Sequence, residues 1–351
     1  MTSLLIQTLN RLERLEPNFV IVDVEDYRDF RAPWWARATD PWEVESIARQ
    51  KARQALGRPF DILLVHGWEM VVAFRDVARR FPSAAVMDTV PARIDFFRRR
   101  QGFSGVGRSL SHRVHHRAFA KAAREFDVFL PKSSDCAASL VRDYGIARER
   151  CFVTLAPQDL DNWKPGTKSV GPPFRLLFVG NDFARKGGHF LLRVYNEHLA
   201  ILCTLKIVSN DPALEGIGLP PHVRWLRGLN REQVLDTYQN SDLFLFPSQQ
   251  DYAPQVLSEA FAAGLPCLVT DFDGARDLVH HNETGFVFSH DAPPEAWAAH
   301  VKQLLADPAR LAAMSASARR FAEDHLSLDR FNALIAEVID KLTWAVGRQP
   351  L

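Results

Sequence analysis

The chain has 351 residues, of which 47% are hydrophobic and 24% charged, and this globular composition excludes disordered, collagenous and coiled-coil proteins. The length is about two to three times that of an ordinary domain and predicts two domains. Four scattered cysteines, the lack of a secretory-signal pattern and the lack of an apolar stretch long enough to span a membrane together predict a cytoplasmic protein.

In the first half of the chain, short apolar runs alternate with segments of helical periodicity, and a helix is predicted over Ser3–Leu15. His66 and Asp88 each follow an apolar run directly, which places them at the carboxyl ends of predicted strands, where ligands of α/β proteins bind. A structural role is the alternative for His66. The runs that predict strands are Phe19–Val22, Ile62–Val65, Ala84–Met87, Val128–Leu130 and Phe152–Leu155.

Positive charge gathers between Arg93 and Arg124, although the net charge of the whole chain is only +1. The overall balance argues against a dedicated nucleic-acid-binding protein, but this segment predicts contact with an anionic partner. An acidic membrane surface, reached from the cytoplasmic side, is the expected partner. An anionic glycan and a merely solvated helix face are the alternatives. The candidate contact residues are Arg98, Arg99, Arg100, Arg113, Arg117 and Lys121.

A second alternation of strands and helices starts at residue 174, after a proline- and glycine-rich segment at residues 163–173 that predicts a linker. This pattern predicts a doubly wound parallel sheet with helices on both faces. The predicted domains are residues 1–165 and 166–325, followed by a C-terminal helix at residues 326–351 that packs back on the first domain. The predicted strands are Phe174–Val179, Leu205–Val208, Val223–Leu226, Leu243–Phe246, Cys267–Thr270 and Phe286–Phe288.

The loop after the first of these strands runs from Gly180 into a helix predicted over His189–His198. Gly180 permits a sharp turn, and Gly187–Gly188 would let the backbone approach a ligand closely. Arg185 and Lys186 stand beside the start of the helix, where two cations and free N–H groups would bind a diphosphate. A solvated basic loop is the alternative.

A further helix is predicted from Pro254 to a stop at Gly264, and Asp251 lies in the loop that precedes it. Glu259 lies within this helix. Its carboxylate either faces solvent or points into a ligand site, where it could accept hydrogen bonds from two sugar hydroxyls.

Together these motifs resemble those of the retaining nucleotide-sugar glycosyltransferases of family 4, in the GT-B superfamily. Asp251, seven intervening residues and Glu259 match the spacing of the family's acidic pair, and the motif Gly264-Leu-Pro266 follows as it does there. Residues 179–187 resemble the family's diphosphate-binding loop. The resemblance covers residues 150–345, and the first half only by architecture. It implies two Rossmann-like domains that face a central cleft.

The resemblance also implies a function and a site. A retaining hexosyltransferase would move a sugar from a nucleoside diphosphate sugar to a glycan or lipid-linked acceptor, without metal or cofactor. Arg185 and Lys186 would hold the diphosphate, Asp251 would lie beside the donor sugar, and the acceptor would enter from the first domain near His66 and Asp88. The residues expected to bind the donor are Gly180, Asn181, Pro254, Gln255, Val256 and Glu259.

The chain departs from the family pattern at several positions. Asp251 stands where the family usually has Glu, Pro254 where it has Gly, and Asp88 where it often has a strand-end His. The family's first strand and glycine-rich loop should precede the first helix, so that strand is expected to be missing. These departures keep two alternatives open. The first is a non-catalytic protein that binds a nucleotide sugar or glycan. The second is a sugar-nucleotide epimerase or phosphorylase of the same fold. A dehydrogenase is disfavoured by the absence of the Gly-x-Gly-x-x-Gly motif.

Overall fold

The structure is a computed structural model that describes residues 60–100, 106–167, 172–252 and 254–346. The helix predicted over Ser3–Leu15 and the strand over Phe19–Val22 lie outside these residues. The chain divides into two compact units. Unit 1 comprises Met1–Thr154 and Asn332–Leu351, and unit 2 comprises Leu155–Phe331. Residues 163–173, the predicted linker, are part of unit 2.

Unit 1 contains a parallel sheet in which β1, β2 and β3 lie side by side in chain order. Its core is made by fully buried side chains such as Val71, Phe119, Phe129 and Leu140. The strands are β1 (Leu63–His66), β2 (Ser83–Met87) and β3 (Val128–Pro131). The helices are α3 (Trp68–Ala73), α4 (Arg75–Ala78), α5 (Pro91–Arg100), α6 (Val106–Ala123), α7 (Ser134–Tyr144) and the short 3-10 turn η2 (Arg148–Arg150).

The strand predicted over Phe152–Leu155 is wrong. This segment runs beside β3, since the amides of Phe152 and Thr154 donate to the carbonyls of Phe129 and Pro131 at 2.9 and 2.8 Å. It forms only an isolated bridge between Cys151 and Phe129, however, and no continuous ladder among the described residues. An apolar run shows that a segment is buried, but strand formation also needs a sustained partner.

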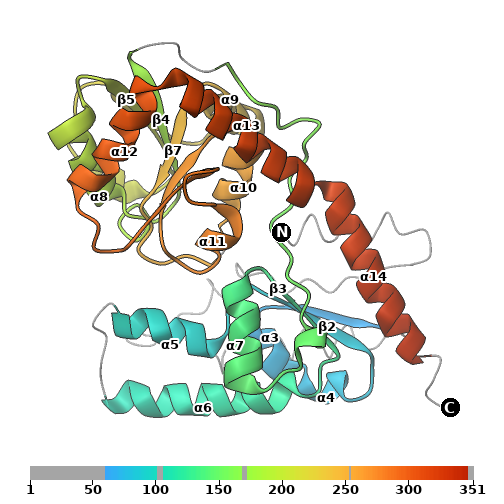
Figure 1. Cartoon of the computed structure of the whole chain (residues 1–351). Helices are drawn as coiled ribbons and strands as arrows, with labels where there is room; N and C mark the ends of the chain where they lie inside the picture. The colour runs from blue at the N-terminus through green and yellow to red at the C-terminus, as the bar shows by residue number, and fades with distance from the viewer. Residues whose placement is uncertain (1–59, 101–105, 168–171, 253, 347–351) are drawn as a thin grey trace. The chain divides into compact units, whose positions relative to one another are not determined.

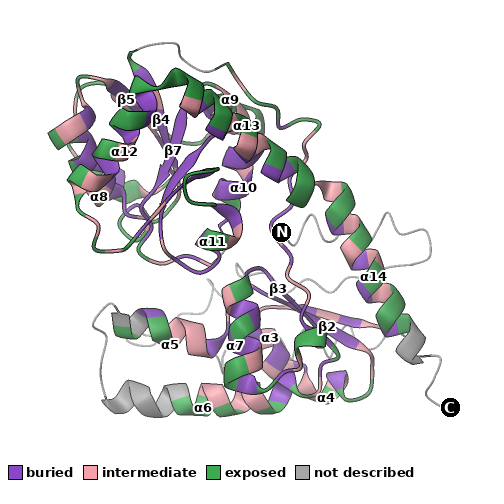
Figure 2. Cartoon of the chain, in the orientation of Figure 1, coloured by how far each residue is buried: buried purple, intermediate pink, exposed green. Residues whose placement is uncertain are grey.

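Unit 2 contains a six-stranded parallel sheet in the order β6-β5-β4-β7-β8-β9. All six predicted strands are confirmed to within two residues at their starts, and most of their side chains are buried (Figure 2). Along the chain, β5 and β6 are added on one side of β4. The chain then crosses to the other side of β4, where β7, β8 and β9 are added in turn. The strands are β4 (Phe174–Val179), β5 (Cys203–Val208), β6 (Val223–Leu226), β7 (Leu243–Phe246), β8 (Cys267–Thr270) and β9 (Gly285–Phe288).

Helices flank both faces of this sheet, with α8 packed against α12 on one side and α10 against α13 on the other (Figure 1). This confirms the doubly wound arrangement that the alternating sequence predicts. The helices are α8 (Gly188–Val194) with the π-helical turn η3 (Tyr195–Leu199), η4 (Pro212–Gly216), α9 (Arg231–Gln239), α10 (Gln255–Ala262), α11 (Ala275–Leu278), α12 (Pro294–Ala306) and α13 (Pro308–His325).

The last helix, α14 (Leu328–Val346), starts in unit 2 and continues into unit 1. Its apolar stripe is buried, including Ile335, Val338 and Leu342. Lys341 donates to the Glu149 carbonyl at 3.3 Å, and its ammonium group lies 4.8 Å from the centre of the Phe152 ring. Within the described part of the chain, no helix is both long and apolar enough to cross a membrane.

Candidate active site

The candidate donor site lies in unit 2 between β4 and β7, where the order in which the strands are added to the sheet reverses direction. At such a point the loops after two adjacent parallel strands diverge to opposite faces and leave a ligand site at the carboxyl ends of the strands. Residues 180–187 follow β4 and residues 247–254 follow β7, so both predicted motifs lie at this reversal point.

The two glycines after β4 pack closely against protein atoms. A Cβ atom on Gly187 would collide with the carbonyl of Pro247, and one on Gly188 with the ring of Phe183. Gly187 also has a φ of 79°, a left-handed conformation that disfavours other residues. Gly187 therefore lets the loop after β4 pack directly against the loop after β7, and Gly188 makes room for a ring of its own loop.

Lys186 and Asp251 form an ion pair across these two loops, between Nζ and Oδ2. Both side chains are largely buried, with 15% and 11% of their surface exposed, so Lys186 does not belong to a solvated basic loop. The carboxylate of Asp251 also accepts the Tyr252 amide at 3.1 Å and the Ser248 hydroxyl at 3.4 Å. An ammonium group has three protons, so Lys186 can hold Asp251 and still donate to an anion.

Arg185 ties the same two loops together from the solvent side. Its Nε donates to Asp182 at 2.6 Å, and a terminal nitrogen donates to the Gln250 carbonyl at 2.7 Å. The Gln249 amide returns a bond to the Arg185 carbonyl at 2.9 Å. The side chain is 40% exposed, so a cation remains available beside the Lys186–Asp251 pair.

Glu259 is half-buried on α10 and faces the protein, which rules out the solvated-face alternative. The Tyr238 hydroxyl of α9 donates to its Oε2 at 2.9 Å, and this bond leaves Oε1 for another donor. Burial raises the pKa of the Glu259 carboxyl above its ordinary value, and the bond from Tyr238 offsets this only in part. Of the other predicted donor residues in this helix region, Pro254 is buried at the N-cap of α10, Gln255 is exposed and Val256 is half-buried.

The other two predicted donor residues, Gly180 and Asn181, follow β4 directly. Asn181 accepts the amide of Asn210 at 2.8 Å, which joins the loops after β4 and β5. A Cβ atom on Gly180 would lie 3.3 Å from Cγ of Lys186, so glycine at this position avoids a tight contact with the lysine side chain. Asp211 fixes the next part of the loop, because it accepts the Phe183 amide at 2.6 Å. The sequence did not predict this contribution of Asn210 and Asp211.

In unit 1, His66 and Asp88 do lie together, at the carboxyl ends of β1 and β2. His66 Nε2 is 3.1 Å from Asp88 Oδ2, and Lys132, which directly follows β3, pairs with Asp88 Oδ1. Burial acts to raise the pKa of the Asp88 carboxyl, but the bond with His66 and the charge of Lys132 outweigh it and hold the pKa well below its usual range.

Glu69 and Lys132 are members of this cluster that the sequence analysis missed. Burial raises the pKa of Glu69 from 4.5 to about 7, and the nearby charge of Asp88 adds to this effect. Lys132 is almost fully buried. Both residues come shortly after predicted strands, and that position was the signal that could have identified them.

The basic segment presents an exposed row on α6. Arg113, Arg117 and Lys121 are all exposed, and no ion pair to them is found among the described residues. Arg99, on α5, is exposed and donates to the Asp95 carbonyl at 3.3 Å. The backbones of Arg98 and Arg100 also lie in α5, but their side chains are outside the described part of the structure.

Comparisons with known sequences agree with the geometry of unit 2. The sequence profile of the family "Glycosyl transferases group 1" matches residues 159–321. The D-inositol 3-phosphate glycosyltransferase of Rhodococcus jostii is 29% identical over 224 residues, which cover 57% of this chain and 49% of that protein. The protein of the same name from Thermobispora bispora is 36% identical over 240 residues, which cover 60% and 54%. The chain thus spans about half the length of the curated relatives it matches.

Solved structures resemble more of the chain. Sucrose-phosphate synthase from Thermosynechococcus elongatus covers 88% of this chain and 80% of its own, with a TM-score of 0.75 at 14% identity. HepE from Anabaena, in complex with UDP, covers 86% and 82%, with a TM-score of 0.66 at 16% identity. With the two parallel sheets, these similarities show that the chain has the GT-B fold, and residues 159–321 resemble the glycosyl transferases of group 1.

Proposed function

We propose that this chain is a retaining hexosyltransferase that moves a sugar from a nucleoside diphosphate sugar to a glycan or lipid-linked acceptor, without a catalytic metal. The observation that carries the proposal is the Lys186–Asp251 ion pair with Arg185 beside it, at the point where the order of the sheet reverses. Both cations are already held in place, so little reorganisation is needed when a diphosphate arrives.

In the proposed reaction, negative charge grows on the diphosphate as its bond to the sugar breaks. Lys186 and Arg185 stabilise this charge, which is the task that a metal ion performs in other transferases. Asp251, which pairs with Lys186, accepts hydrogen bonds from donor-sugar hydroxyls and tolerates positive charge on the ring. The acceptor hydroxyl attacks from the face that the diphosphate leaves, so the anomeric configuration is retained.

Glu259 is the proposed ribose ligand. Its Oε2 is occupied by Tyr238, which orients the carboxylate and leaves Oε1 for a ribose hydroxyl. In unit 1, the cluster of His66, Glu69, Asp88 and Lys132 is proposed to bind the acceptor. It offers a buried cation, an imidazole and a carboxyl that titrates near neutral pH, a set that can orient a hydroxyl group and take up its proton.

The decisive experiment is a thermal-shift screen with UDP, GDP and ADP, followed by donor-hydrolysis and transfer assays on the nucleotides that bind. UDP and UDP-glucose are tested first because HepE was solved with both. D-Inositol 3-phosphate is one acceptor to include, since relatives carry it in their names. We expect NMR of the product to show retention, and the rate to be the same with and without added Mg²⁺. Nucleotide binding without turnover on any donor would favour the non-catalytic alternative.

We further propose that the protein works on the cytoplasmic face of a membrane and attaches through the exposed row on α6. The support is the row of three exposed cations, Arg113, Arg117 and Lys121. Attachment there would bring a lipid-linked acceptor within reach of the enzyme.

A further inference from the structure

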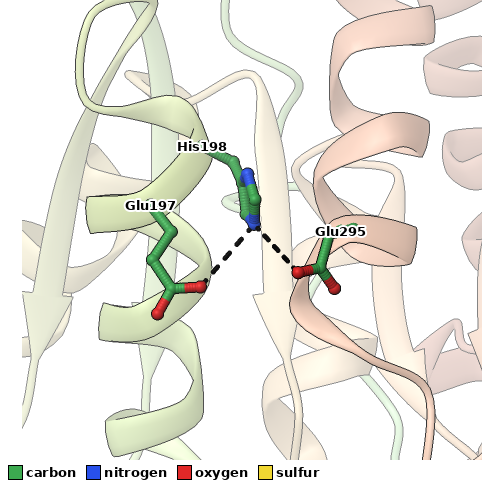
Figure 3. Close-up of side chains that lie close together, drawn as sticks. All are labelled: Glu197, His198 and Glu295. Carbon is green, nitrogen blue, oxygen red and sulfur yellow. Dashed lines mark ion pairs between the residues drawn. The ribbon is translucent and has the colours of Figure 1, made fainter.

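Three side chains that could ligate a metal converge in unit 2 on elements that the proposed transfer reaction does not use. Glu197 and His198 lie on the π-helical turn η3, and Glu295 lies in the first turn of α12 (Figure 3). His198 Nε2 lies between the carboxylates, 3.7 Å from Glu197 Oε2 and 3.7 Å from Glu295 Oε1. The ligand atoms of all three lie within 4.8 Å of one another.

The ring nitrogen at the centre of this group lacks a hydrogen bond within the part of the chain that the structure describes. His198 Nε2 is buried, and no hydrogen-bond partner for it exists among the described residues. Both carboxylate oxygens lie beyond hydrogen-bond distance. A buried polar atom without a partner is costly, so an arrangement that retains one calls for an explanation.

The backbone holds these residues in place independently of any ligand. The α-helical pattern of α8 widens into the π-helical turn, a rare feature that changes the direction of the side chains on it and is frequent at functional sites. Tyr195 anchors the turn, since its buried hydroxyl donates to the Cys203 carbonyl at 2.8 Å. Phe190 of α8 packs against Trp297 of α12 with ring centres 5.7 Å apart, which fixes the two helices against each other.

The spacing of the three groups is close to that of ligands around a tetrahedral ion. Zinc bonds to histidine nitrogen and carboxylate oxygen are about 2.0–2.1 Å long, so neighbouring ligands of a tetrahedral ion stand about 3.3 Å apart. The two 3.7 Å separations from His198, and the spacing of all three ligand atoms within 4.8 Å, can shorten to this value by side-chain shifts. One imidazole and two carboxylates also match the ligand preferences of Zn²⁺ and leave a fourth position for water.

We infer that Glu197, His198 and Glu295 form a binding site for one Zn²⁺-like divalent transition-metal ion. The ion clamps the end of the α8–η3 helix to the start of α12. The Arg185–Lys186 loop adjoins Gly188 at the start of that helix, whereas Glu197 and His198 lie at its other end. The ion therefore has a structural role and takes no part in the proposed transfer reaction. The site does not depend on that reaction being correct.

The test is calorimetric titration of the full chain with ZnCl₂, after metal has been removed with a chelator and the chelator dialysed away. We expect one ion per chain and a rise in the midpoint of thermal unfolding of at least about 3 °C at saturating Zn²⁺. MgCl₂ should give neither effect, because Mg²⁺ prefers oxygen ligands in octahedral geometry.

Variants locate the site. His198→Ala and Glu295→Gln should each weaken Zn²⁺ binding at least tenfold, whereas His325→Ala, at an exposed histidine of α13, should bind as the parent does. Visible absorption of bound Co²⁺ should report tetrahedral geometry in the parent and be lost in His198→Ala. Equal Zn²⁺ binding by the parent and His198→Ala would overturn the inference. So would a parent that binds no Zn²⁺ and loses stability in His198→Ala, since the three groups would then form only an ion-pair cluster.

Discussion

At the residue scale, Lys186 has two tasks, because it neutralises Asp251 in the free protein and is proposed to stabilise the leaving diphosphate. Lys186→Ala should lower turnover about 10²-fold or more, the scale for loss of one preorganised charge-stabilising donor. Steady-state transfer rates on the true donor provide the measurement. Arg193→Ala is the matched control, because it removes an exposed cation from the same helix region and should leave the rate near the parent value. Near-parental rates in Lys186→Ala would refute the assignment of this loop.

A substitution of Glu259 tests whether this residue binds the ribose of the nucleotide. Glu259→Gln keeps the shape of the side chain and an acceptor for Tyr238 but loses the charge. A charge-assisted hydrogen bond contributes about 1.5–3 kcal/mol, so affinity for the nucleoside diphosphate should fall roughly 10- to 100-fold. Calorimetry with the nucleotide alone measures this. An unchanged affinity would mean that Glu259 serves only to position Tyr238.

Glu69 gives unit 1 a pH dependence of its own. Its pKa is about 7 in the folded chain against 4.5 ordinarily, so between these values the folded state holds a proton that the unfolded state has lost. The free energy of unfolding therefore falls as pH rises from about 4.5 to 7, by at most about 3 kcal/mol, and is level above that range. Glu69→Gln should remove this fall and be more stable than the parent at pH 8. Denaturant unfolding at several pH values measures it, with exposed Asp61→Asn as the control; parallel pH curves for the parent and Glu69→Gln would contradict the prediction.

The sequence identified Lys186 and Asp251 separately, through motif spacing, but could not show that they pair. Sixty-five positions separate them, and their contact depends on β4 and β7 lying side by side. The same holds for Tyr238 and Glu259, which come from different helices. The glycine pair at positions 187 and 188 predicts a close approach to the backbone, and in the structure the Pro247 carbonyl and the Phe183 ring lie against the Cβ side of these residues.

At the scale of elements, α6 carries the clearest surface prediction. Arg113, Arg117 and Lys121 are exposed, and basic residues near an acidic bilayer each contribute about 1 kcal/mol to binding. The protein should therefore co-sediment with anionic vesicles and not with neutral ones, and high salt should release it. Substitution of all three residues by Gln should abolish this binding.

A matched triple substitution to Gln in exposed cations of unit 2 should leave vesicle binding unchanged. Equal recovery with anionic and neutral lipid, or binding that salt does not affect, would exclude the membrane proposal. The exposed control cations are Arg193, Lys302 and Arg320.

The elements of unit 2 could be predicted because each buried parallel strand is a short apolar run between helical segments. In unit 1 the same reasoning found β1, β2 and β3 but added a strand at Phe152–Leu155. That segment is apolar and hydrogen-bonds along β3, and burial alone does not distinguish such a flanking segment from a strand. The π-helical turn η3 was not foreseen either, because residues 195–199 carry an ordinary helical pattern.

At the scale of the whole molecule, α14 contributes to the stability of a unit from which it is distant in sequence. Ile335 is buried and belongs to unit 1, so Ile335→Ala should lower the free energy of unfolding of that unit by about 2–5 kcal/mol. Hydrogen exchange read peptide by peptide separates the two units, and protection should fall in residues 60–154 and not in unit 2. Glu337→Ala, on the exposed side of the same helix, should change neither unit. Loss of protection in unit 2 alone would contradict this assignment.

Because unit 1 combines Met1–Thr154 with Asn332–Leu351, it cannot be completed before all of unit 2 has been synthesised. Asn332–Leu351 leave the ribosome only after all of Leu155–Phe331 has been made, which at ordinary translation rates takes on the order of ten seconds or more. During that interval the surface later covered by Ile335, Val338 and Leu342 is open, while unit 2 is free to fold first. The N-terminal half is therefore the part of the nascent protein that needs protection from aggregation, and the contacts of Lys341 with Glu149 and Phe152 can form only after unit 2 has been synthesised.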